Sequence, residues 1–140
     1  MPVKSIARGA EQLVTAGPDT TVRDLAQLLQ EGAVGSVVIV EDGEPVGIVT
    51  DRDLALEVIN RDLDFETPAS DVMTRDPVTV EAEMGVYEMC EKMKHNGVRR
   101  MPVIEDGELV GIVTLDDLVV LLQDEMEDIA DVIRSEAPPY

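Results

Sequence analysis

An internal repeat constrains the fold of this chain more than any other feature of its sequence. The segment EDGEPVGIVTDRDL at 41–54 recurs as EDGELVGIVTLDDL at 105–118, with 11 of 14 positions identical at an offset of 64 residues. Self-similarity at a fixed offset indicates that one supersecondary unit occurs twice. The sequence therefore predicts two structural units of the same kind.

The same offset extends upstream and gives the content of each unit. It pairs 14–15 with 78–79, and it pairs apolar positions within 22–29 with others within 86–93, both at the helical spacing i, i+3, i+4, i+7. Each unit reads as a short strand near Thr15 or Thr79, an amphipathic helix, two strands joined by an Asp-Gly turn, and a second helix. The expected class is α+β, with two tandem β-α-β-β-α motifs and hairpins at 37–40 with 46–49 and 101–104 with 109–113.

The size of the units predicts that they pack together as one module. A unit of about 60 residues alone buries only about 60% of its unfolded surface, and the expected strands are apolar at nearly every position, as strands covered on both faces are. We expect a first motif at 1–62, a connector at 63–70 that contains Pro68, a second motif at 71–136, and a tail at 137–140 that frays.

The last expected helix, 115–134, carries an apolar stripe longer than the repeat requires. The equivalent helix of the first motif ends near Asn60, so the surplus apolar face must be covered by something else. A second copy of the chain is the most economical partner, which predicts a homodimer formed by the helices after each hairpin. The stripe comprises Leu115, Leu118, Val119, Leu122, Met126, Ile129 and Ile133.

Charge excludes several classes of partner. The chain has 30 acidic residues against 11 basic ones, a formal net charge of −19, which argues against nucleic acid and against an anionic membrane surface. Arginine outnumbers lysine eight to three. An acidic surface with so little lysine is expected of a protein from a halophile.

Residue types argue against an enzyme and against a metal site. Cys90 is the only cysteine, which excludes an internal disulfide and favours a reducing, cytoplasmic compartment. Its position on the apolar stripe of a helix predicts a core role, and His95 lies five residues away on another face, so the two do not form a nucleophile pair. The longest aliphatic run, 118–122, is too short to span a bilayer.

Each hairpin ends in the pattern G-h-h-T-x-x-D, where h is apolar, at 47–53 and at 111–117. At a strand-to-helix junction the Thr and the Asp can form a capping box that satisfies free backbone amides. They can equally bind a ligand, because amides and a hydroxyl at a helix start hold phosphate and a carboxylate accepts hydrogen bonds from a sugar diol. The pattern alone leaves both readings open.

This order of elements, twice in tandem over nearly the whole chain, resembles a pair of cystathionine-β-synthase (CBS) domains. The resemblance implies two motifs packed sheet to sheet with pseudo-twofold symmetry, leaving two clefts that bind AMP, ADP, ATP or S-adenosylmethionine, with Mg²⁺ as a candidate companion of the phosphates. It implies a non-enzymatic regulatory module that signals to a partner protein. The alternative is a dimerisation or scaffold module that binds no ligand.

The resemblance also assigns site residues by position. The phosphate and ribose contacts are Thr50 and Asp53 in the first motif and Thr114 and Asp117 in the second. The second motif matches the adenine-lining segments better, because Val38 stands where the family usually has proline, so we expect the two clefts to bind unequally. The lining positions are Thr15, Ala16, Val37 and Val38 in the first motif, and Thr79, Val80, Met101 and Pro102 in the second.

A basic cluster falls within nine positions of the second motif, at Lys92, Lys94, Arg99 and Arg100. Such a cluster is either a solvated patch that neutralises nearby carboxylates or a phosphate clamp. We favour the clamp because the two arginines directly precede an adenine-lining segment. Arg52, inside the first G-h-h-T-x-x-D pattern, is a further candidate.

Overall fold

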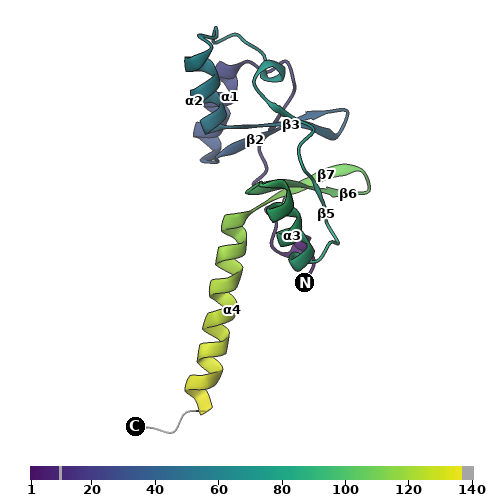
Figure 1. Ribbon diagram of the computed structural model, residues 1–140, viewed down its shortest axis with the longest axis vertical. Coiled ribbons are helices and arrows are strands. Elements are labelled where there is room, and N and C mark those ends of the chain that lie inside the picture. Colours follow the sequence, from purple (N-terminus) through teal and green to yellow (C-terminus); the bar gives the residue numbers. More distant parts are fainter. Residues whose placement is uncertain (10, 137–140) are drawn as a thin grey trace.

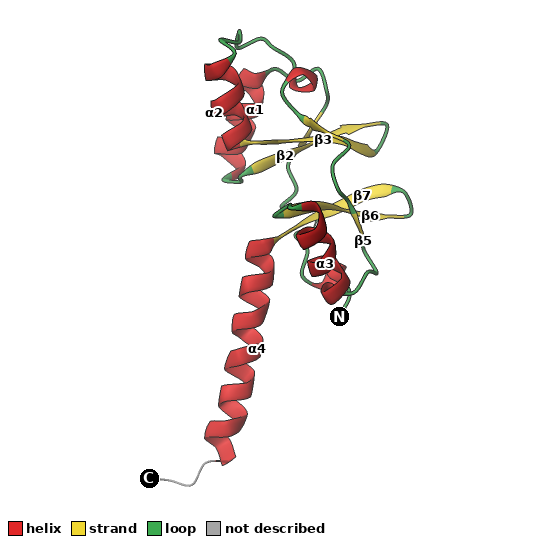
Figure 2. Cartoon of the chain, in the orientation of Figure 1, coloured by secondary structure: helices red, strands yellow, loops and turns green. Residues whose placement is uncertain are grey.

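Two sheet-and-helix units of the same topology make up the chain (Figures 1 and 2). The computed structural model describes residues 1–9 and 11–136. The predicted β-α-β-β-α order is confirmed in both units. The first unit contains β1 (Thr15–Ala16), α1 (Val22–Gly32), β2 (Ser36–Glu41), β3 (Glu44–Thr50) and α2 (Asp51–Asn60); the second contains β5 (Val80–Glu81), α3 (Val86–Asn96), β6 (Arg100–Glu105), β7 (Glu108–Thr114) and α4 (Leu115–Glu136).

The two sheets share one register. In each, a short parallel strand pairs with the first strand of an antiparallel hairpin, and Val38 pairs with Ile48 as Pro102 pairs with Ile112. Both Asp-Gly turns are left-handed at their two central residues, with φ of 53° and 81° at 42–43 and of 52° and 80° at 106–107. This is the geometry of a type I′ turn, which Asp-Gly favours and which matches the twist of a hairpin.

Short segments before each repeat cross over to the opposite unit. The 3₁₀ turn η1 (Val3–Ser5) buries Val3 completely in the core of the second unit, and its Lys4 forms an ion pair with Glu83 that raises the pKa of that lysine. The turn η2 (Ala69–Asp71) buries Ala69 in the core of the first unit. The sequence places 1–62 together in the first motif, whereas the structure packs the start of that stretch on the second core.

The crossing segments also extend the edge of each sheet. Strand β4 (Thr74–Arg75) pairs with β3, and Arg8 pairs with Ile112 of β7 through backbone bonds of 2.9 and 3.0 Å. A Cβ atom on Gly111 would lie 2.4 Å from the Arg8 carbonyl oxygen. Gly111 is therefore required because the crossing backbone passes directly over it.

Aliphatic side chains fill the two cores and join the sheets. A smaller cluster between the hairpins holds Val38, Ile48 and Ile112 and connects β2 and β3 to β7. Cys90 is half-buried against the second core, as its position on the helix predicts. Within the described residues, no helix is long and apolar enough to cross a membrane.

Candidate functional site

Two clefts lie between the units, and each combines a threonine from one unit with a hairpin start from the other. The Thr50 cleft, about 260 Å³, joins Thr50 and Asp53 of the first unit to Val78 and Pro102 of the second. The Thr114 cleft, about 300 Å³, joins Thr114 to the first unit; its main contributors there are Val14, Gly35, Ser36 and Val38. Both volumes are near the lower end of the range for small-molecule sites.

Both Thr/Asp pairs form capping boxes at the starts of α2 and α4. The Asp53 amide donates to Thr50 Oγ1 and the Thr50 amide donates to Asp53 Oδ2, each at 3.0 Å. At α4 the Thr114 amide donates to Asp117 Oδ2 at 2.8 Å, and the Asp117 amide donates to Thr114 Oγ1 at 3.3 Å. The capping interpretation is therefore confirmed. A ligand must bind through the hydrogen-bonding positions that the capping boxes leave unused.

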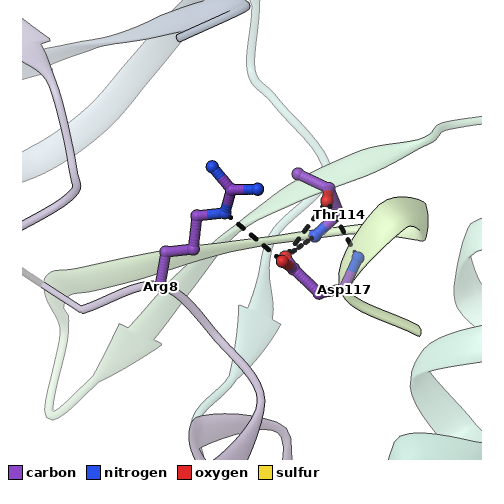
Figure 3. Close-up of polar contacts among 3 residues, drawn as sticks. All are labelled: Arg8, Thr114 and Asp117. Atoms are coloured by element: carbon purple, nitrogen blue, oxygen red, sulfur yellow. Dashed lines mark hydrogen bonds and ion pairs between the residues drawn. The ribbon is translucent and has the colours of Figure 1, made fainter. Parts of the chain in front are cut away.

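The two capping boxes differ in how many carboxylate oxygens remain free to accept a hydrogen bond from a ligand. Asp117 Oδ1 accepts a hydrogen bond from Arg8 Nε at 3.3 Å, and its Oδ2 accepts further from the Thr114 hydroxyl at 3.0 Å (Figure 3). Among the described residues, no group bonds to Asp53 Oδ1. A carboxylate oxygen accepts more than one hydrogen bond, so the Asp53 carboxylate is the more available acceptor of the two.

The clefts also differ in charge. The Thr114 cleft is lined by Arg8, Arg99 and Arg100 and by one acid, Asp116. The Thr50 cleft is lined by the same pair Arg99 and Arg100, but by two acids, Asp53 and Asp76. A Cβ atom on Gly35 would lie 3.3 Å from Arg100 Nη1, so this guanidinium lies on the Thr114 side. The Thr114 cleft is therefore the more electropositive of the two.

The structure brings together part of the predicted site. Thr50, Asp53, Arg99, Arg100 and Pro102 meet in the Thr50 cleft, while Val38 and Thr114 meet in the other cleft beside the two arginines. The best-matching lining segment, which belongs to the second motif, therefore faces the Thr/Asp pair of the first. This arrangement across the motifs was not evident from the repeat, because the repeat aligns positions without placing them in space.

Other predicted positions lie elsewhere. The side chains of Val37, Val80 and Met101 are buried in the two cores and do not line a cleft. Of the basic cluster, Lys92 donates to the Thr79 carbonyl and Lys94 is exposed outside both clefts. The remaining predicted positions outside the lining of both clefts are Thr15, Ala16, Arg52, Thr79 and Asp117, the last of which stays next to Thr114 through its capping bonds.

Sequence reasoning did not identify Arg8, Val14, Asp76 and Val78 as cleft residues. Val14 and Val78 are equivalent positions in the repeat, and this equivalence could have indicated that both line a cleft. Arg8 lies upstream of the aligned segments, so the repeat gives no indication that it lines a cleft. Within 1–9 and 11–136, no group of three or more His, Cys, Asp or Glu side chains is placed to hold a metal ion.

Comparison with known proteins identifies the family. The CBS domain model matches residues 3–60 and 69–124. The chain is 38% identical over 135 residues to the uncharacterized protein MK0525 of Methanopyrus kandleri, covering 89% of this chain and 68% of that one. It is 36% identical over 109 residues to the CBS domain-containing protein YhcV of Bacillus subtilis, covering 78% of each.

Two similar solved structures contain adenosine-based ligands. The CBS domain pair of protein MJ0100, in complex with 5'-methylthioadenosine and S-adenosyl-L-methionine, is 26% identical with a TM-score of 0.79, and the match covers 89% of this chain and 98% of that one. The CBS domain protein PAE2072 from Pyrobaculum aerophilum, complexed with AMP, is 28% identical with a TM-score of 0.75, covering 88% and 97%. The family match, the repeat and the two clefts agree: the chain belongs to the CBS domain family and carries a tandem CBS pair.

Proposed function

We propose that this CBS pair is a regulatory module that binds an adenosine-containing ligand between its motifs and transmits the change to a partner protein. The observation that carries the proposal is the free Asp53 Oδ1, on a cleft whose opposite wall is Val78 and Pro102. A carboxylate that accepts from a ribose diol and an apolar wall for the base are the two contacts that an adenosine moiety needs. Two similar CBS pairs hold such ligands.

The clefts are suited to different ligands because their charges differ. The three arginines of the Thr114 cleft favour a phosphate, which guanidinium groups bind in a bidentate manner. The Thr50 cleft, with Asp53 and Asp76, accommodates a neutral or cationic tail such as those of methylthioadenosine and S-adenosylmethionine. We therefore assign phosphorylated adenosines to the Thr114 cleft and phosphate-free ones to the Thr50 cleft.

Ligand binding offers a direct route to regulation. Each cleft takes one wall from each motif, so a bound ligand links the two motifs and fixes their relative orientation. A partner that contacts both motifs would respond to that change because its surface differs between the free and bound states.

Thermal denaturation tests the proposal directly. A ligand that binds only the native state at 100 times its Kd stabilises it by about 2.7 kcal/mol, which raises the Tm by several degrees. We expect this shift with AMP, ATP or S-adenosylmethionine, and not with ribose 5-phosphate or methionine, which lack the base, as matched controls. Native mass spectrometry of the purified protein should detect the same class of ligand. If no adenosine compound changes the Tm, the alternative of a ligand-free dimerisation module stands instead.

A further inference from the structure

Helix α4 projects away from the two sheets (Figure 1). One of its faces is apolar and exposed. Six of the helix's eight exposed apolar residues follow one another at alternating intervals of four and three, and the other two are Val120 and Val132. Their exposed fractions range from 39% at Leu115 to 70% at Met126. We name this set the α4 seam: Leu115, Val119, Leu122, Met126, Ile129 and Ile133.

The spacing of the α4 seam is that of a coiled coil. A 4-3-4-3-4 pattern repeats every 3.5 residues on average, which keeps the seam on one side of a supercoiled helix pair. In the heptad frame, Val119, Met126 and Ile133 occupy a positions, and Leu115, Leu122 and Ile129 occupy d positions. β-Branched residues at a with leucine at d favour two parallel strands, and two of three positions of each kind follow that preference.

Within the described residues, the seam from Val119 to Ile133 is 58–70% exposed, while Leu115 at its start also lines the Thr114 cleft. The opposite side of α4, at Asp117, Val120 and Leu121, lines a groove with the N-terminal residues Met1 and Ile6. The seam lies about half a turn away from that groove, because successive residues turn by about 100° around an α-helix. A second helix can therefore lie along the seam without displacing the N-terminal segment.

Charge at the flanking positions also selects the parallel arrangement. Glu125 is the one charged residue at a g position of the α4 seam. In a parallel pair it faces Ala130 of the second copy, which occupies the e position five residues on. In an antiparallel pair aligned on the same apolar layers, Glu125 faces Glu125 of the second copy. Like charges across a coiled coil are unfavourable, so the parallel pair avoids the repulsion.

We propose that α4 forms a parallel, in-register, two-stranded coiled coil with α4 of a second copy of this chain, which places the second CBS motifs of the two copies side by side. The dimer expected from the sequence thereby acquires a specific interface and orientation. The inference rests on α4 and is independent of ligand binding in the clefts.

Substitutions in the full chain test the interface. Light scattering in molar KCl should give a dimer for the natural sequence and a monomer for Leu122→Glu with Ile129→Glu, because two charges in an apolar seam weaken association by at least about a hundredfold. The matched control is Val120→Glu, which has a similar exposure of 58% but lies outside the seam, and it should stay dimeric. A monomeric natural chain, or a seam variant that stays dimeric, would overturn the proposal.

A cysteine crosslink tests the orientation without changing the seam. Glu136 ends α4 at the next d position, so in a Cys90→Ser background Glu136→Cys should form an interchain disulfide readily under mild oxidation. In an antiparallel pair aligned on the same apolar layers, Leu115 lies opposite Ile133 of the second copy, so residue 136 would lie about 36 Å along the helix axis from its counterpart. A dimer that does not crosslink at position 136 would therefore overturn the parallel arrangement.

Discussion

Arg8 Nε lies 3.3 Å from Asp117 Oδ1, and this contact links the first residues of the chain to the helix that leaves its last strand (Figure 3). Arg8 is placed by backbone bonds to Ile112 on the edge of β7. Asp117 is placed by the capping box of α4. Both residues are thus held by the fold, and their contact makes the Thr114 cleft different from the Thr50 cleft, where Thr74 takes the corresponding edge position.

Replacing Arg8 should change ligand selection more than stability. The guanidinium side chain is 43% exposed, and an ion pair this accessible contributes at most about 1 kcal/mol to folding. Arg8→Ala should therefore keep the Tm within a few degrees and weaken AMP binding about tenfold, with S-adenosylmethionine binding unchanged. Arg23→Ala, which removes an exposed ion pair with Glu66 outside both clefts, is the control. Equal losses for both ligands would contradict the charge assignment of the clefts.

Gly111→Ala should destabilise the chain because the new methyl group would lie 2.4 Å from the Arg8 carbonyl oxygen. Relieving this contact requires backbone movement, so we expect a loss of about 1–3 kcal/mol in the free energy of unfolding, measured by urea denaturation. Gly17→Ala, where a Cβ atom has open space, is the matched control and should change stability by less than about 1 kcal/mol. Equal stability of the two variants would show that the crossing segment moves freely.

Stability should rise with salt concentration. The chain has a net charge of −19, and five ion pairs occur within residues 1–9 and 11–136, so most carboxylates repel one another without a local cation. Potassium chloride screens this repulsion. The Tm should therefore increase by several degrees between low and molar KCl, as expected of a halophile's protein.

A variant with fewer charges provides the control for this salt effect. Glu88→Gln with Glu91→Gln removes two exposed acids of α3, so it should have a higher Tm at low salt and a smaller increase with KCl. A Tm that stays flat or falls as KCl is added to the natural chain would contradict the halophile interpretation.

Much of the fold was predictable from the repeat because its signals are local. The Asp-Gly turns, the apolar hairpins and the capping Thr/Asp pairs each depend on residues within a few positions of one another. The crossing segments were not predicted, since the burial of Val3 among residues of the second unit is a contact between distant parts of the chain. Short 3₁₀ turns also lack the periodicity that identifies helices and strands.

The candidate site was predictable as a set of residues but not as two clefts. Thr50, Asp53 and Pro102 were all named from sequence, yet their meeting in one cleft depends on how the motifs pack. Val37 and Met101 were named with them, but alternate residues of a strand face opposite sides of its sheet, so their side chains point into the cores.

Titration calorimetry of Asp53→Asn with S-adenosylmethionine tests whether Asp53 binds a ligand in addition to capping α2. Thr21 caps α1 outside both clefts, so Thr21→Ala is the control: it should lose about 0.5–2 kcal/mol of stability and keep the affinity of the natural chain. Asp53→Asn should bind ten- to a hundredfold more weakly, because a charged hydrogen bond to the ribose contributes about 1.5–3 kcal/mol. If Asp53→Asn loses stability but binds as tightly as the natural chain, Asp53 is a helix cap only and does not bind a ligand in the Thr50 cleft.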